Sequence, residues 1–283
     1  MTSLSETSPV GVPALLSAKG REKIAMMTAY DASSARLLDA AGIDVLLVGD
    51  SVEMTVYGRA NTLTATMDVM VRHTRAVADA SRRALVVGDM PFLSYQADAR
   101  DAVVNAGRLL AQGGCSAVKV EGGRRVLSAV EAIVAADIPV MGHVGLTPQS
   151  YRKFGGFKVQ GKNAADAAEI RLDAEALAQA GCFALVLECV PESLAAEITH
   201  DLSIPTIGIG AGAGCDGQVL VFHDVMGLTG ASSTPRFVRR YAELAPLVEE
   251  AAREFAREVK SGAFPSAAES FTGEAIPALR RIY

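Results

Sequence analysis

The chain has 283 residues, of which 50% are hydrophobic and 21% charged, with a formal net charge of -5. This length suits one large domain or two small ones, and the composition favours a folded protein with a large core over a disordered one. There is no Lys/Arg-rich block, no leader-like apolar segment and no apolar run of membrane-spanning length, so binding to nucleic acid, secretion and membrane insertion are not expected.

Cysteine spacing excludes two further classes of site. The four cysteines form no C-x-x-C pair, which argues against a zinc site and against a thioredoxin-like redox centre; they are Cys115, Cys182, Cys189 and Cys215. We expect buried, reduced thiols in a cytoplasmic protein.

Apolar runs alternate with helical patterns along the chain. After a polar lead-in (1–20) with one short apolar patch, eight runs have the continuous hydrophobicity of strands buried on both faces. They are Ile24–Thr28, Ile43–Val48, Ala84–Val87, Ala117–Val120, Ile138–Val144, Phe183–Val190, Ile204–Ile209 and Gln218–Phe222. Helices are expected over Ala32–Ala41, Met67–Arg82, Asp101–Gln112, Arg124–Ala136, Ala164–Ala180, Pro191–His200 and Pro235–Lys260. The link between the seventh and eighth runs shows no long helical pattern.

Eight strand-like units in one chain of this length predict an α/β protein built as a (β/α)₈ TIM barrel. The barrel is expected over residues 21–265, with a loosely organised tail over 266–283. A doubly wound parallel sheet is the alternative fold.

Four carboxylates stand at the ends of apolar runs: Asp50, Asp89, Glu121 and Glu188. The carboxyl ends of parallel strands meet at one rim of such a sheet, where α/β enzymes place their chemistry. The four side chains are therefore expected to gather at one site. The competing interpretation is that each acid caps the helix that follows its strand.

Strand alternation adds a buried lysine to this site. Lys119 and Glu121 are two residues apart and share a face, while Val118 and Val120 face the helices. By the same parity, Asp50 lies on the face of Val48 and Asp89 on the face of Val87. A crowded group of carboxylates favours a hard divalent cation such as Mg²⁺, which prefers oxygen ligands, and Lys119 would then hold a substrate carboxylate.

Glu188 interrupts an apolar run, so burial is expected to raise its pKa and make it a candidate general base. The alternative is a core glutamate paired with a lysine or arginine. His143 ends the fifth run on the same rim and is a candidate site residue, whereas His73 and His200 fall on helices. His223 stays undecided. Ser51 has no visible His/Asp partners, so a serine nucleophile is not expected.

The glycine-rich stretch 208–214 matches the dinucleotide fingerprint only loosely, because a strand-like run follows it instead of a helix. It indicates either a close approach of the backbone to a ligand or tight packing at the rim.

In eight segments the sequence resembles the ketopantoate hydroxymethyltransferase (3-methyl-2-oxobutanoate hydroxymethyltransferase) family. The segments occur in the family's order: Met27–Asp31, Leu47–Ser51, Val87–Phe92, Val118–Gly123, Gly142–Gln149, Phe154–Gly161, Leu187–Pro191 and Ile207–Gly212. The resemblance implies a barrel of the phosphoenolpyruvate/pyruvate superfamily type and a homo-oligomer, usually a decamer.

The resemblance also implies roles for single residues. Mg²⁺ would be bound through Asp50, Asp89 and Glu121, and the keto acid by Asp50, Ser51, Asp89, Lys119 and the rim residue His143. Glu188 matches the family's proton acceptor. The implied reaction transfers a hydroxymethyl group from 5,10-methylenetetrahydrofolate to 3-methyl-2-oxobutanoate through a Mg²⁺-stabilised enolate, giving 2-dehydropantoate, the precursor of pantothenate. The segment 154–161 is expected to act as a mobile lid.

Two positions depart from the family pattern, since Glu53 replaces a usual glycine and Thr64 a usual proline. Glu53 is expected either to alter metal affinity or to face solvent. Two rival functions remain: a Mg²⁺-dependent lyase or mutase of the same superfamily acting on another keto acid or a phosphonate, and a non-catalytic keto-acid binding protein.

Overall fold

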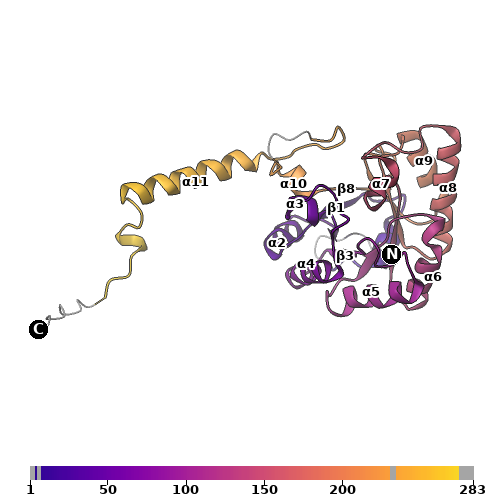
Figure 1. Ribbon diagram of the computed structural model, residues 1–283, viewed down its shortest axis with the longest axis horizontal. Helices are drawn as coiled ribbons and strands as arrows, with labels where there is room; N and C mark the ends of the chain where they lie inside the picture. The colour runs from indigo at the N-terminus through magenta and orange to yellow at the C-terminus, as the bar shows by residue number, and fades with distance from the viewer. Residues whose placement is uncertain (1–3, 5–7, 230–233, 274–283) are drawn as a thin grey trace, which may run out of the picture.

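Eight parallel strands close into a barrel in the computed structural model, which describes residues 4, 8–229 and 234–273 (Figure 1). The strands follow one another around the barrel in chain order, and β1 pairs with both β2 and β8. They are β1 (Ile24–Thr28), β2 (Val45–Val48), β3 (Leu85–Asp89), β4 (Ala117–Lys119), β5 (Val140–Gly145), β6 (Ala184–Glu188), β7 (Thr206–Ile209) and β8 (Gly217–Leu220). The predicted TIM barrel is confirmed.

Helices surround most of this barrel. They are α1 (Val12–Ala18), α2 (Ala32–Ala40), α3 (Val52–Thr55), α4 (Met67–Ala80), α5 (Ala99–Ala111), α6 (Leu127–Ala135), α7 (Tyr151–Phe154), α8 (Ala164–Gln179), α9 (Glu192–Asp201), α10 (Phe222–Val225) and α11 (Leu244–Ser261). Three short 3₁₀ helices are η1 (Arg124–Val126), η2 (Pro148–Ser150) and η3 (Ala267–Glu269).

Side-chain caps fix where four of the helices begin. Asp31, Thr66, Asp98 and Asn163 precede α2, α4, α5 and α8, and the side chain of each accepts a hydrogen bond from a backbone N–H of the first turn. Such a cap supplies a partner to an N–H group that has none inside the helix. None of the four rim carboxylates is the N-cap of its following helix, so the capping interpretation of these acids is wrong.

The core has two layers that follow strand alternation. Val45, Leu85 and Ala117 belong to the cluster inside the barrel, whereas Val118 and Val120 belong to the cluster between the strands and the helices. Both sets are buried. This explains why the strands read as continuous apolar runs.

Helix α1 lies within the expected polar lead-in and covers one end of the barrel. Its Leu15 and Ala18 pack in the inner cluster with Ile24 and Met26 from the start of β1. Lys19, the residue that follows the helix, forms a 2.8 Å ion pair with Asp216 just before β8. The apolar patch of the lead-in therefore closes the amino-terminal end of the barrel.

The glycine-rich link between β7 and β8 packs against the protein itself. All residues of this link are described and none is helical, as the sequence indicates. A Cβ on Gly212 would lie 2.3 Å from the Glu192 side chain, and one on Gly210 would lie 2.8 Å from Phe237. Both glycines have positive φ. Of the two interpretations, tight packing at the rim is the one the structure supports.

The final predicted helix begins later than expected. Instead of starting at Pro235, α11 starts at Leu244, because the preceding backbone pairs with the short helix α10. The N–H of Tyr241 donates to the carbonyl of Val225, and that of Leu244 donates to Met226. The eighth apolar run is also shorter than predicted, since Phe222 already belongs to α10.

The four cysteines are free and buried, as predicted. Burial raises the pKa of the Cys115 and Cys182 thiols to about 12. Among the described residues, no helix combines the length and the apolar character needed to cross a membrane.

If α1 closes the barrel by burial, Leu15→Ala should lower the free energy of unfolding by about 2–5 kcal/mol in urea denaturation, as buried leucine truncations do. Leu16→Ala is the matched control, because Leu16 is 39% exposed whereas Leu15 is 1% exposed. Its cost should stay near 0.5 kcal/mol. Equal costs for the two variants would contradict the role given to α1.

Candidate active site

The predicted site residues meet at the carboxyl ends of the strands. Asp89, Lys119 and Glu188 are the last residues of β3, β4 and β6, and His143 lies in β5. Asp50 and Glu121 follow β2 and β4 by two residues. Together with Ser51, all of them line one cavity of about 680 Å³. This is the end of the barrel where TIM-barrel enzymes hold their catalytic groups.

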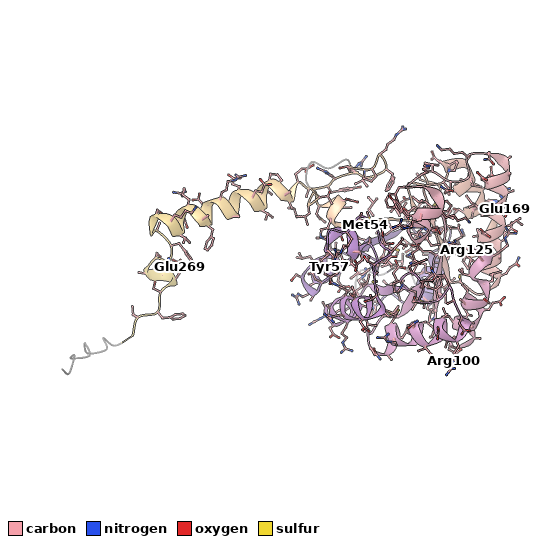
Figure 2. All side chains as sticks on the ribbon, viewed as in Figure 1. Met54, Tyr57, Arg100, Arg125, Glu169 and Glu269 are labelled. Atoms are coloured by element: carbon pink, nitrogen blue, oxygen red, sulfur yellow. The ribbon has the colours of Figure 1, made fainter. Side chains whose placement is uncertain are left out.

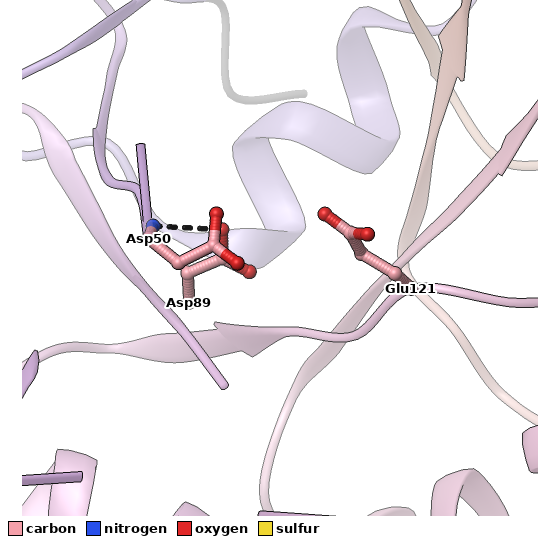
Figure 3. Close-up of side chains that lie close together, drawn as sticks. All are labelled: Asp50, Asp89 and Glu121. Atoms are coloured by element: carbon pink, nitrogen blue, oxygen red, sulfur yellow. Dashed lines mark hydrogen bonds between the residues drawn. The ribbon is translucent and has the colours of Figure 1, made fainter. Parts of the chain in front are cut away.

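Three of the carboxylates form a compact cluster. Asp50, Asp89 and Glu121 are buried, and each offers an oxygen within 4.8 Å of the other two (Figure 3). The backbone N–H of Asp50 donates a 3.2 Å hydrogen bond to Asp89 Oδ2. Asp89 Oδ1 is buried, and its one close partner among the described residues is the Lys119 ammonium at 2.9 Å. Three buried carboxylates beside a single ammonium offer the oxygen ligands that a hard cation such as Mg²⁺ prefers.

Lys119 provides the nearest positive charge. Its Nζ lies 2.9 Å from Asp89 Oδ1, 3.5 Å from Glu121 Oε1 and 3.4 Å from His143 Nδ1. Burial alone would lower the pKa of Lys119, but Asp89, Glu121 and Asp50 raise it above its ordinary value. The ammonium group is therefore charged and links two members of the cluster.

The three carboxyl groups differ in their pKa values. Burial, followed by the charges of Asp89 and Glu121, raises the pKa of Asp50 well above its ordinary value. Burial also raises the pKa of Asp89, although Lys119 opposes this. Burial acts in the same direction on Glu121, but Lys119 and His143 outweigh it and bring that pKa to about 2. Without a cation, the ionisation of Asp50 is thus strongly opposed by its surroundings.

His143 connects the acidic cluster to Glu188. Its Nδ1 lies 3.5 Å from Glu121 Oε1, and its Nε2 lies 3.2 Å from Glu188 Oε2, although the second contact is not a well-directed hydrogen bond. Burial and Lys119 lower the pKa of His143, but Glu121 and Glu188 raise it to about 9. The partner of Glu188 is this histidine, where the sequence suggested a lysine or arginine.

Strand alternation predicts one part of the site and fails for another. Ala117 packs inside the barrel while Val118 and Val120 face the helices, so Lys119 and Glu121 share the inner face as expected. Val48, by contrast, packs in the outer layer, although Asp50 lines the cavity. The strand ends at Val48 and turns at Gly49, so the alternation no longer applies at Asp50.

Gly49 leaves room for the Ser51 hydroxyl at this turn. A Cβ at that position would lie 2.7 Å from Ser51 Oγ and 3.9 Å from Asp89 Oδ2. Ser51 Oγ is held at 2.8 Å from the hydroxyl of Tyr30. A side chain at Gly49 would therefore displace the hydroxyl that the sequence assigns to substrate binding.

Comparison with known proteins agrees with this arrangement. A family model described as ketopantoate hydroxymethyltransferase matches residues 10–267. The chain belongs to the ketopantoate hydroxymethyltransferase family. It is 54% identical over 270 residues to 3-methyl-2-oxobutanoate hydroxymethyltransferase of Nitratidesulfovibrio vulgaris, covering 95% of this chain and 88% of the relative. It is 56% identical over 250 residues to the enzyme of that name from Citrifermentans bemidjiense, covering 88% of this chain and 93% of the relative. These are transferases, and the family name places their reaction in pantothenate biosynthesis.

Solved structures with a similar fold belong to a wider group of barrels. A phosphonopyruvate hydrolase in complex with oxalate and Mg²⁺ superposes with a TM-score of 0.60 at 15% identity, covering 92% of this chain and 93% of the other. A 2,3-dimethylmalate lyase, described as a PEP mutase/isocitrate lyase superfamily member, gives 0.57 at 16% identity, covering 96% and 89%. At this identity the similarity concerns the fold alone, which is the barrel fold that the sequence predicts.

The two departures from the ketopantoate hydroxymethyltransferase pattern contact each other. Thr64 Oγ1 donates a 2.5 Å hydrogen bond to Glu53 Oε2. Glu53 is 5% exposed and does not line the cavity, so the expectation that it faces solvent is wrong. It is not a member of the three-carboxylate cluster either. The two residues stabilise the loop after β2 from behind the site.

The remaining histidines lie outside the acidic cluster. His73 lies on α4, where its Nδ1 is 2.6 Å from the carbonyl of Tyr30 and its Nε2 is 2.9 Å from the Tyr57 hydroxyl. His200 is exposed at the end of α9. His223 is half-buried beside the Tyr30 ring, and burial lowers its pKa.

Two buried residues of the site escape prediction from the sequence. The Tyr95 hydroxyl bonds Gln149 Oε1 and the backbone C=O and N–H of Glu121. Gln149 in turn donates hydrogen bonds to Asp50 and Glu121. Gln149 ends one of the segments that resemble the family, and its polarity beside a proline is the only signal. Nothing in the local sequence distinguishes Tyr95.

The pKa of Asp50 makes stability depend on pH in the metal-free protein. A carboxyl group with a raised folded-state pKa contributes stability that is complete below its ordinary pKa of 3.8 and is lost as pH rises through the folded-state value. Asp50→Asn should therefore be more stable than the wild type in EDTA at pH 8, by about 1–3 kcal/mol in urea denaturation, and the difference should shrink toward pH 4. The exposed Asp68→Asn is the control and should show no such trend. A difference for Asp50→Asn that does not change with pH would contradict the assignment.

Proposed function

We propose that the chain transfers a hydroxymethyl group from 5,10-methylenetetrahydrofolate to 3-methyl-2-oxobutanoate and so produces 2-dehydropantoate. The observation that carries this proposal is the cluster of Asp50, Asp89 and Glu121 beside Glu188 in one cavity. Membership of the ketopantoate hydroxymethyltransferase family supports it.

Mg²⁺ is the cofactor that the cluster favours, with Asp50, Asp89 and Glu121 as its protein ligands. When bound, it would act as a Lewis acid that stabilises negative charge developing on the oxygens of a keto acid. Support comes from the closeness of the three buried carboxylates and from the burial and neighbouring charges that raise the pKa of Asp50. The phosphonopyruvate hydrolase of similar fold contains Mg²⁺ together with oxalate, a small planar dianion.

The keto acid would be oriented by the polar groups on the cavity wall. Lys119 supplies a fixed positive charge for an anionic substrate, and Ser51 supplies a hydroxyl. His143 and the two aspartates complete this wall. Fixed charges in a buried site stabilise a developing anion without having to reorganise.

Glu188 is proposed as the base that removes the proton from C3 of the keto acid. Its Oε2 lies 3.2 Å from His143 Nε2, a contact that orients the carboxylate at the cavity wall. The resulting carbon nucleophile forms a bond to the one-carbon unit of the folate. The overall conversion consumes one water and releases tetrahydrofolate and 2-dehydropantoate.

The outer part of the cavity offers room for the folate. Its volume of about 680 Å³ lies in the range of drug-sized ligands and exceeds what a five-carbon keto acid fills. Phe157 and Val159 from the segment predicted as a lid line one side, and Phe237 and Val238 line another. Closure of residues 154–161 over both substrates is part of the proposal.

Deuterium exchange tests the proposed chemistry. With 3-methyl-2-oxobutanoate and Mg²⁺ in D₂O, the wild type should exchange the C3 proton, detected by NMR, and should form product only when methylenetetrahydrofolate is present. Glu188→Gln should slow the exchange by about 10²–10⁴-fold. EDTA should suppress it in the wild type.

Glu197→Gln is the matched control, because Glu197 is exposed on the outer helix α9. It should exchange at the wild-type rate. Undiminished exchange in Glu188→Gln would contradict the assignment of Glu188 as the base but not the proposed reaction. No exchange and no folate-dependent product in the wild type would contradict the whole reaction, and exchange without any product would favour a lyase or mutase of the same superfamily.

We further propose that the protein is a cytoplasmic homo-oligomer, with the decamer that the family resemblance implies. Helix α11 supports assembly, because it has eighteen residues and none of them is buried. It projects away from the barrel, and its side chains extend into open space (Figure 2). Leu247, Val248, Phe255 and Val259 share one face of this helix and are 47–59% exposed. The four reduced cysteines suit the cytoplasm.

Light scattering coupled to size-exclusion chromatography tests this assembly. The full chain should elute as an oligomer, and Leu247→Glu combined with Phe255→Glu should lower the measured mass, because charge on the apolar face prevents its burial. Glu250→Lys, on the polar side of the same helix, should leave the mass unchanged. A monomeric wild-type chain would contradict the proposal.

A further inference from the structure

We propose that Gln149 is a positioning residue that holds the metal-binding carboxylates in place without touching metal or substrate. The inference rests on the proposed metal site at Asp50, Asp89 and Glu121. Gln149 lies in η2, in the loop after β5, and is 6% exposed. It does not line the cavity, so it stands behind the carboxylates.

One glutamine contacts two of the three carboxylates. Its side-chain Nε2 donates a 3.0 Å hydrogen bond to Asp50 Oδ2, and its backbone N–H donates a 2.9 Å hydrogen bond to Glu121 Oε2. Asp50 follows β2 and Glu121 follows β4. A single residue from the loop after β5 therefore fixes the spacing of two ligands from other strands.

The surroundings of the amide leave it one orientation. Nε2 also donates a 2.9 Å hydrogen bond to the carbonyl of Met90, while Oε1 accepts hydrogen bonds from Tyr95 at 2.8 Å and Gln96 at 2.9 Å. A carbonyl oxygen only accepts hydrogen bonds, so a rotated amide would place two acceptors against each other at Met90. The amino group must therefore face Asp50.

The hydrogen bonds that backbone N–H groups and amides donate to the three carboxylates involve only one of the two oxygens of each group. One oxygen of each carboxylate accepts a hydrogen bond from the protein: Asp50 Oδ2, Asp89 Oδ2 and Glu121 Oε2. The second oxygen of each receives no hydrogen bond from a backbone N–H or an amide among the described residues; Lys119 and His143 are the groups that approach Asp89 and Glu121 there. Gln149 thereby holds one oxygen of Asp50 and one of Glu121, and it leaves the other oxygen of each without a hydrogen bond from a backbone N–H or an amide.

A neutral donor suits this task better than a second lysine. An amide orients a carboxylate without cancelling its charge, so the attraction for a divalent cation is retained. Residues that orient metal ligands from behind in this way usually change metal affinity by 10–100-fold when they are removed. The predicted effect of losing the Gln149 amide is thus on cation binding itself, in the absence of any substrate.

Manganese binding tests the inference. The full-length protein is titrated with Mn²⁺, which takes similar oxygen ligands, and free Mn²⁺ is measured by electron paramagnetic resonance. Gln149→Met keeps the length of the side chain but removes its hydrogen bonds, and should raise the Mn²⁺ dissociation constant at least tenfold. Tyr95→Phe keeps the amide but removes the hydroxyl that bonds both Gln149 Oε1 and the backbone of Glu121, and should raise the constant about threefold. Circular dichroism of the metal-free variants reports whether each one folds.

Gln218→Met is the matched control, because the Gln218 amide bonds the carbonyl of Gly212 far from the carboxylates. It should bind Mn²⁺ within twofold of the wild type. A folded Gln149→Met with wild-type affinity would overturn the positioning role and leave the metal site intact. If Gln149→Met does not fold, wild-type affinity in Tyr95→Phe would overturn it equally. A wild-type chain that binds no Mn²⁺ would remove both the metal site and this role.

Discussion

The buried charge of Lys119 is the interaction on which the site depends. Three carboxylates within a few ångströms of one another would repel strongly in a water-poor environment, and removing one partner from such a group leaves uncompensated charge. Lys119 lies at the end of β4 between Asp89 and Glu121, where strand geometry fixes its position. It compensates part of the negative charge and leaves the remainder for a cation. The same ammonium stands 3.4 Å from His143 and so links the cluster to the neighbouring Glu188 pair.

Around this centre the barrel separates two kinds of carboxylate. Asp50, Asp89 and Glu121 are enclosed and receive directed hydrogen bonds from the protein, whereas Glu188 is 14% exposed at the cavity wall and contacts one imidazole. The first arrangement suits fixed ligands. The partial exposure of Glu188 leaves its carboxylate accessible to a substrate proton, and Cys189, which follows it with a left-handed φ of 47°, ends the strand at that point. The surroundings of each carboxylate therefore distinguish the two proposed roles more than residue type does.

Much of this was predictable from the sequence, for physical reasons. Strands buried on both faces are continuously apolar, so the barrel could be predicted. The carboxyl ends of parallel strands meet at one rim, so the gathering of four carboxylates could be predicted too. Strand alternation correctly predicted that Lys119 and Glu121 share one face of the sheet. It failed at Asp50, because the chain turns at Gly49. The contacts of Gln149 and the histidine partner of Glu188 join residues from different strands, and no local pattern encodes them. The start of α11 was also not predictable, because it depends on backbone bonds to α10.

The placement of α11 separates two parts of this chain. Every residue proposed to act on the keto acid or the cation precedes residue 189, and the outlying helix begins at Leu244. Changes in the exposed face of this helix leave the buried carboxylates untouched, so its sequence is free to drift with whatever surface it meets. Substitutions on this helix are thus expected to affect the proposed assembly without altering the interior of the barrel mouth. The proposed chemistry and the proposed association therefore belong to separate segments of the chain.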